Sequence, residues 1–224
     1  FSREVDIQCR YIKQTGGRGK FAVISCKFTP LTKDQVEEYR LKLEEEGEKP
    51  DPNNIYFEDN IVGGVVPREY IPSVEAGFRD SCVKGAKYGF PLVDLICSLH
   101  DGKYHDVDSS QDAFKAAAME CTRDAQGLAG ITLLEPIMKV AIASPEQYQG
   151  TLAGDVNRRR GVIENLTSEA GRCQIMAHIP LSELFGYTSD LRNVTSGTAS
   201  FTMEPSHYAP VKEELADLRK PGDK

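Results

Sequence analysis

Residues 92–110 read LVDLICSLHDGKYHDVDSS, and they define the pattern of the first half of the chain. Apolar residues fall at alternate positions from Val93 to Leu99, which is typical of a strand over Leu92–His100. The polar stretch His100–Ser110 follows, and Ser109 or Ser110 can cap the next helix. That helix has one apolar face, made of Phe114, Ala117, Cys121 and Ala125. The stretch therefore predicts a strand, a polar loop with a glycine hinge at its centre, and a helix.

A second loop of the same kind lies near the N-terminus. Glu4–Ile12 and Phe21–Phe28 alternate as strands, so the glycine-rich residues between them predict a hairpin end. Each loop carries basic side chains, and the later one adds histidine and tyrosine, a combination that favours a rigid tip inserted into RNA. A glycine-rich turn that contacts nothing is the alternative for the first loop. The candidate tip residues are Gly16, Gly17, Arg18, Gly19, Lys20, His100, Gly102, Lys103, Tyr104, His105, Asp106 and Val107.

The charge of the chain is unevenly distributed. The net charge is −7 over 224 residues, and residues 34–59 alone hold ten acids and three bases. The acidic stretch Asp34–Glu46 has a helical apolar spacing and predicts a solvated helix, within an insertion at about residues 34–52. The remainder of the chain is neutral, so the acidic total does not exclude RNA binding by the two basic loops.

Composition sets the class of protein. Apolar residues make up 40% of the chain, enough for a substantial core, and none of the apolar runs has the length of a membrane span. The six cysteines form no C-x-x-C pair, which favours reduced, buried thiols in a cytoplasmic protein. The N-terminus has neither a signal peptide nor an initiating methionine, so we expect a fragment of a longer protein.

The order of the remaining segments predicts two domains and a tail. A strand at Ile55–Val62 and a helix from about Tyr70 to Cys82 complete a first domain at residues 1–132. Residues 133–207 show the order β-α-β-β-α-β, which is the ferredoxin-like pattern. Its segments are Glu135–Ala143, a helix from Pro145, Val162–Leu166, Arg172–Ile179, a helix at Leu181–Leu191 with Leu184 and Phe185 inward, and Ala199–Met203. Residues 208–224 form a tail with a short helix.

Three consecutive arginines, Arg158, Arg159 and Arg160, end the first helix of the second domain. The negative end of the helix dipole accounts for at least one of them. Contact with phosphate groups is the second interpretation of the run.

Six blocks of the sequence, in order, closely resemble elongation factor G. They are GGRGKF (16–21), GGVVPREYIP (63–72), YHDVDSS (104–110), LEPIMKV (134–140), GDVNRRRG (154–161) and PLSELFGY (180–187). The resemblance implies an α+β fold of two domains. The first is a ribosomal-protein-like arm domain with a left-handed βαβ crossover, and the second is a ferredoxin-like βαββαβ domain.

The resemblance also implies a function. The arm tip would enter the decoding region of the small ribosomal subunit behind transfer RNA and messenger RNA, and the arginine run would contact the large subunit. The expected partners are the ribosomal RNA of both subunits, tRNA and mRNA, for a cytoplasmic monomer that contacts no membrane. A paralogue that recycles or protects ribosomes is one alternative, and a small-molecule enzyme on a related fold is a more distant one.

No catalytic residue, metal or cofactor is expected in this chain. The Gly-x-x-x-x-Gly-Lys-Ser/Thr pattern that cradles nucleotide phosphates does not occur in it. By resemblance the full-length protein is a GTPase that binds GTP and magnesium, and its nucleotide domain lies outside this chain.

Overall fold

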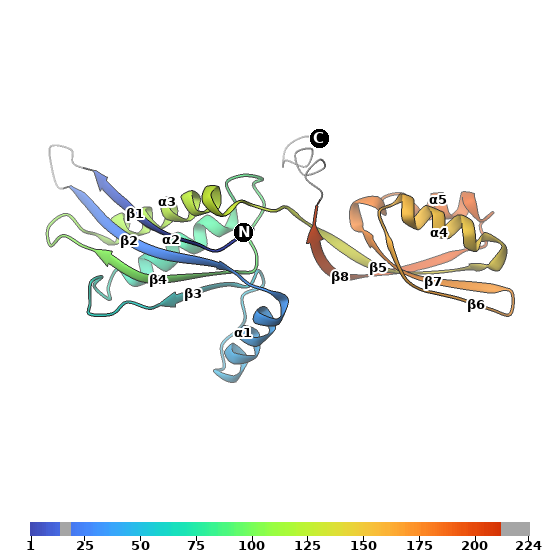
Figure 1. The fold of residues 1–224 in the computed structure, drawn as a ribbon, viewed down its shortest axis with the longest axis horizontal. Coiled ribbons are helices and arrows are strands. Elements are labelled where there is room, and N and C mark those ends of the chain that lie inside the picture. Colours follow the sequence, from blue (N-terminus) through green and yellow to red (C-terminus); the bar gives the residue numbers. More distant parts are fainter. Residues whose placement is uncertain (14–18, 212–224) are drawn as a thin grey trace. The chain divides into compact units, whose positions relative to one another are not determined.

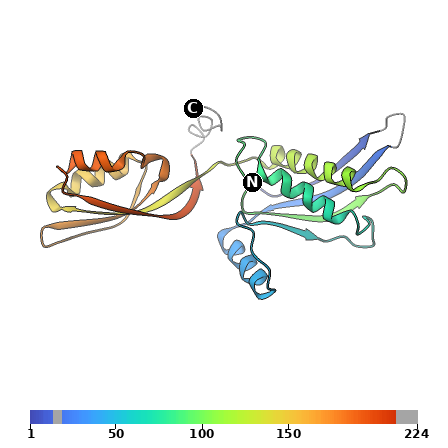
Figure 2. The same ribbon diagram turned by 180° about the vertical axis from the view of Figure 1, so that it is seen from behind.

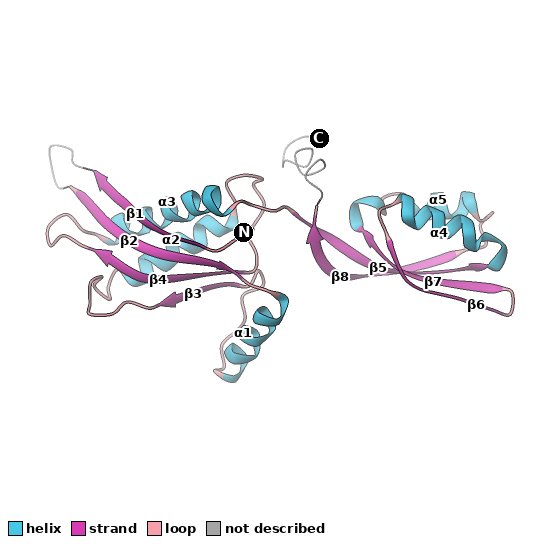
Figure 3. Ribbon diagram, viewed as in Figure 1, coloured by secondary structure: helices cyan, strands magenta, loops and turns pink. Residues whose placement is uncertain are grey.

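The fold is known from a computed structural model that describes residues 1–13 and 19–211. The chain divides into two compact units between Thr132 and Leu133, the boundary that the sequence predicts. Each unit is an antiparallel or mixed sheet with helices against one face (Figures 1 and 3), so the class is α+β as expected. Among the described residues, no helix combines the length and apolarity needed to cross a bilayer.

The first unit is built on a sheet of four strands in the order β1-β2-β4-β3. The strands are β1 (Val5–Lys13), β2 (Lys20–Pro30), β3 (Ile55–Asp59) and β4 (Leu95–Lys103). Strands β3 and β4 are parallel, and helix α2 (Ile71–Val83) connects them. Seen from the helix side with the strands pointing right, β4 lies above β3 (Figure 2), so the crossover has the uncommon left hand that the resemblance implied.

Helices α2 and α3 (Gln111–Ala129) cover one face of this sheet, and the core lies between the two layers (Figure 1). Ser110 caps α3 by accepting a hydrogen bond from the Ala113 amide at 3.2 Å. The predicted apolar face of α3 is buried, and the Phe114 ring stacks on Tyr70 with centroids 4.6 Å apart. The periodicity of the sequence therefore identified this face of the core correctly.

The acidic segment forms a helix that contributes no buried residue. Helix α1 (Lys33–Glu45) begins at a capping box between Thr32 and Gln35 and projects away from the sheet (Figure 1). Its contact with the unit runs through Tyr39, which stacks on Tyr56 at 5.1 Å and donates a hydrogen bond to Glu58 at 2.5 Å. The expectation of a solvated acidic helix is confirmed.

Two predicted strands of the first unit have different limits in the structure. Strand β4 begins at Leu95 because Asp94 has a left-handed backbone, with φ of 54°, and it continues to Lys103. Strand β3 ends at Asp59, where the Ile61 amide donates to the Asp59 carboxylate and turns the chain away from the sheet. Alternation of side chains extends beyond both ends and could not locate these turns.

The second unit has four strands in the order β6-β7-β5-β8, all antiparallel to their neighbours. They are β5 (Leu134–Pro145), β6 (Val162–Glu169), β7 (Arg172–Pro180) and β8 (Ser200–Pro210). Helices α4 (Gln149–Arg158) and α5 (Tyr187–Val194) cover one face, each preceded by a 3₁₀ turn, Glu146–Tyr148 and Leu181–Glu183. This is the expected ferredoxin-like βαββαβ arrangement.

Two details of the second unit correct the sequence analysis. The predicted helix 181–191 is interrupted at Gly186, whose φ is 76°, and Phe185 points outward with 79% of its surface exposed. Tyr187 and Leu191 fill the core in its place. Strand β8 runs to Pro210, so residues 208–210 belong to the sheet and not to a tail. The predicted terminal helix lies outside the described residues.

All six cysteines are free and buried, as predicted. Burial raises the pKa of the Cys82 thiol to about 12, which keeps it protonated at neutral pH. The cysteines therefore act as small apolar residues of the core.

Candidate nucleic-acid interface at the end of the first sheet

Three connections meet at one end of the first sheet (Figure 3). They are the β1–β2 hairpin, the β4–α3 connection and the β3–α2 connection. The last two lie together because parallel strands β3 and β4 end at the same edge. The sequence predicted the first two as a tip and missed the third, residues 60–70. Its signal was the Gly63-Gly64 pair, where both glycines have left-handed backbones with φ of 73° and 70°.

The hairpin presents a basic end. Gly16, Gly17 and Arg18, which the sequence assigned to the tip, lie outside the described residues. Lys20 is exposed and pairs across the ladder with Lys13, a second exposed lysine that the sequence analysis did not select. Two neighbouring ammonium groups at the end of a hairpin can attract phosphate groups.

The second tip loop is shorter than predicted, because His100, Gly102 and Lys103 belong to strand β4. His100 is the extra residue of a β-bulge opposite Ser25 and Cys26 of β2. Its Nε2 lies 2.9 Å from a carboxylate oxygen of Asp6 on β1, so its side chain is held within the sheet. The tip loop begins only at Tyr104.

Gly102 is not a hinge. It lies in extended strand, and a Cβ there would approach Val66 Cγ2 to 2.5 Å and the Val23 carbonyl oxygen to 2.6 Å. Val66 belongs to the third loop and is 1% exposed. The absent side chain at Gly102 therefore lets the third loop pack against β4, and the expectation of a flexible hinge was wrong.

The loop from Tyr104 to Asp108 exposes groups suited to nucleic acid. The His105 side chain is 54% exposed, and the exposed Tyr104 ring and Lys103 flank it. His105 Nδ1 accepts hydrogen bonds from the backbone amides of Val107 and Asp108, both at 3.3 Å. The imidazole is thereby fixed to its own loop, and a placed ring with neighbouring cations can stack on a base and contact phosphate.

The two tip loops are bonded to each other. The Gly19 amide donates to Asp108 Oδ1 at 3.1 Å, and the Phe21 amide donates to the Asp108 carbonyl oxygen at 2.9 Å. The Ser109 hydroxyl donates to the Phe21 carbonyl oxygen at 2.7 Å. The sequence analysis considered Asp108, Ser109 and Ser110 as caps of helix α3, but only Ser110 has that role.

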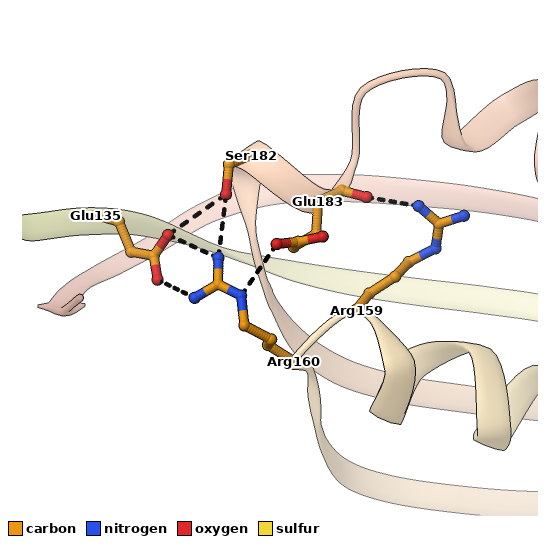
Figure 4. A network of polar contacts seen from close by, with 5 residues as sticks. All are labelled: Glu135, Arg159, Arg160, Ser182 and Glu183. Atoms are coloured by element: carbon orange, nitrogen blue, oxygen red, sulfur yellow. Dashed lines mark hydrogen bonds and ion pairs between the residues drawn. The ribbon is translucent and has the colours of Figure 1, made fainter. Parts of the chain in front are cut away.

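The arginine run of the second unit is mostly engaged within its own domain (Figure 4). Arg160 forms a two-pronged ion pair with Glu135, whose side chain is 5% exposed, and also bonds Glu183. Arg159 bonds the Glu183 carbonyl oxygen at 2.6 Å. Of the three arginines, only Arg158 keeps a largely exposed side chain, at 72%. The phosphate-contact interpretation therefore narrows to Arg158.

Arg159 is the most buried of the three, with a side chain 10% exposed over the Tyr187 ring. Burial opposes its charge, but hydrogen bonds to Asp155 and Asp190 hold the pKa of its guanidinium above the ordinary value. It joins α4 to α5 as a permanent cation. Its position at the end of a helix, which the sequence showed, did not reveal these partners.

The residues of this chain do not fit a nucleotide with its metal. The phosphate-cradling glycine pattern is absent from the sequence. Within residues 1–13 and 19–211, no three side chains of histidine, cysteine, aspartate or glutamate are grouped to hold a metal ion.

Comparison with known proteins places this geometry in a family. Residues 1–130 match the family model described as elongation factor G, domain IV, and residues 132–219 match elongation factor G C-terminus. The chain belongs to the elongation factor G family. It is 46% identical over 205 residues to elongation factor G of Gluconobacter oxydans (strain 621H), and 44% identical to that of Granulibacter bethesdensis (strain ATCC BAA-1260 / CGDNIH1).

The match covers 92% of this chain and 27% of each of these two elongation factor G sequences. A crystal structure of a protein from Thermus thermophilus has the same arrangement, with a TM-score of 0.76 at 30% identity over 97% of this chain and 30% of that one. The chain thus comprises domain IV and the C-terminal region of a translation elongation factor, a protein of protein biosynthesis. The first unit, with the tip, is domain IV of elongation factor G.

Proposed function

We propose that this chain is the ribosome-contacting arm of a GTP-dependent translocase. The tip of the first unit enters the decoding region and contacts tRNA and mRNA, and the second unit contacts ribosomal RNA of the large subunit through Arg158. The observation that carries the proposal is the joined pair of tip loops, which presents His105 and Lys20 at the end of a rigid sheet in an elongation factor G chain.

The distribution of charge supports RNA contact at the tip. Strand β2 runs from the tip at Lys20 to Pro30, and the acidic helix α1 follows at the opposite end of the sheet (Figure 1). Eleven extended residues separate the two ends, a length of roughly 35 Å. This is several Debye lengths at physiological salt, so the acids of α1 do not cancel the attraction of the tip for phosphate.

The mechanism is mechanical and electrostatic. GTP with magnesium is bound and hydrolysed by a part of the protein outside this chain, and hydrolysis reorients the arm. The tip then occupies the space vacated by tRNA and mRNA and disfavours their backward movement. The residues of this chain make and break no bond: they hold a shape and place a ring and positive charges. The factor acts as a monomer in the cytoplasm.

The test is a rapid-mixing translocation assay beside single-round GTP hydrolysis, using the full-length protein with His105→Ala. A stacked base contributes about 1–3 kcal/mol, so translocation should slow by roughly 5- to 150-fold, with hydrolysis near normal. His100→Ala is the matched control, because that imidazole is held by Asp6 within the sheet. Lys20→Ala should weaken the same step less, and its defect should shrink at high salt. Unchanged translocation with His105→Ala would reject the proposal.

A further inference from the structure

The contact between the two tip loops has a second consequence, which concerns how His105 is held. We propose that Asp108 and Ser109 are positioning residues that lock the start of β2 onto the second tip loop and fix the His105 ring with Nε2 as its hydrogen-bond donor. We call Gly19, Phe21, His105, Asp108 and Ser109 the tip latch. The inference depends on the proposed function only for what His105 contacts, and the geometry of the latch stands separately.

Asp108 bonds in three directions. Its carboxylate accepts from the Gly19 amide, and its carbonyl oxygen accepts from the Phe21 amide, across a sequence separation of 89 residues for the first pair. Its own amide donates to His105 Nδ1 at 3.3 Å. A single residue therefore connects the imidazole to the strand that carries the other loop.

Glycine is the residue type that permits this approach at position 19 without a shift. A Cβ at Gly19 would lie 3.0 Å from the Asp108 carboxyl carbon and 3.1 Å from each carboxylate oxygen. Such distances are shorter than ordinary van der Waals contact, so a larger residue would push the carboxylate away. The glycine of the first loop thus has a packing role beyond flexibility.

Ser109 completes the connection from a buried position. It is 3% exposed, and its hydroxyl donates to the Phe21 carbonyl oxygen at 2.7 Å while it accepts from the His105 amide at 2.9 Å. A hydroxyl has one hydrogen to donate, so Ser109 commits it to β2. The backbone of His105 is consequently tied to the same strand as Asp108.

The imidazole can satisfy this network in one neutral tautomer only. Nδ1 accepts from two backbone amides, so its lone pair is occupied and the proton of the neutral ring is on Nε2. The Phe21 ring lies beside the imidazole, with centroids 6.0 Å apart. A ring of fixed tautomer and orientation loses little freedom when it meets RNA, which is the advantage of a prearranged contact.

The first experiment measures the latch in this chain by NMR, with Asp108→Ala and the rescue variant Asp108→Asn. Alanine removes the acceptor for the Gly19 amide, so hydrogen exchange at Gly19 should accelerate up to about tenfold. The His105 ring nitrogens should shift from one tautomer toward a mixture. Asparagine keeps an acceptor oxygen and should restore both signals.

Asp101→Ala is the matched control, because it removes an exposed carboxylate of β4 near the tip without touching the latch. It should leave Gly19 exchange and the His105 tautomer as they are. Unchanged signals in Asp108→Ala, or equal changes in Asp101→Ala, would overturn the latch.

The second experiment measures translocation by the full-length protein. Asp108→Ala should slow the step that His105→Ala slows, and the double variant should be no slower than His105→Ala alone, because both remove one placed ring. Additive defects would overturn the positioning role. If His105→Ala leaves translocation normal while Asp108→Ala still changes the NMR signals, the proposed function fails and the latch remains.

Discussion

Replacement of Gly102 by alanine tests whether contact or flexibility explains this glycine. Gly102 lies in extended strand, where alanine is allowed. If the glycine were a hinge, alanine would stabilise the fold by about 0.4–1 kcal/mol through the unfolded chain. The contacts at 2.5 Å to Val66 and 2.6 Å to the Val23 carbonyl oxygen predict the opposite sign. Overpacking of this kind costs about 1–3 kcal/mol, and a backbone neighbour that cannot move aside favours the upper part of that range.

The assay is amide hydrogen exchange in β2 and β4, with β7 of the second unit as an internal reference. A loss of about 2–3 kcal/mol reduces protection by roughly 30- to 150-fold. Val66→Ala alone should cost about 2 kcal/mol, since it empties a buried site. The double variant should lose less than the sum of the two, because one of the two clashes disappears. Protection that rises in Gly102→Ala, or full additivity in the double variant, would refute the contact.

Four further predictions concern the rest of the chain. Replacing residues 34–49 by a short linker should lower stability by only about 1 kcal/mol in thermal unfolding, because helix α1 buries no side chain and loses mainly one hydrogen bond; collapse of the first unit would show that the helix belongs to the core. Calorimetry of this chain with GTP and magnesium should give no saturable heat, and a micromolar site would contradict the assignment of the nucleotide domain to another part of the protein. Arg159→Ala should destabilise the second unit by about 3–5 kcal/mol in urea unfolding, whereas Arg158→Ala should change stability by less than about 0.5 kcal/mol; equal effects would contradict the difference in burial. Although burial pushes the pKa of Glu58 upward, hydrogen bonds from Tyr39 and two neighbouring side chains hold it below the ordinary value of 4.5. Its ionised form therefore stabilises the fold above about pH 4.5 and this contribution is lost as the pH falls further, so the stability difference between wild type and Glu58→Gln should vanish in acid; a difference that grows in acid would reverse the sign.

The elements that the sequence located well are those whose buried face repeats along the chain. The face of α3 from Phe114 to Ala125 and the alternation of β1, β2 and β7 depend only on which side of each element is apolar. The order of segments after residue 133 then restricts the second unit to one common arrangement, the ferredoxin-like fold. These features are local, so a single sequence carries them.

The sequence by itself therefore determined the two units, most of their elements and the two loops that carry His105 and Lys20. Only the tertiary structure decided that His100 and Gly102 lie within β4 and that the third loop packs against Gly102. It also decided that Asp108 meets Gly19, 89 residues away, and that two of the three arginines are engaged within their own domain. Periodicity reports which face of an element is buried, but it carries no information on strand register or on the partner that a polar side chain meets when distant segments come together.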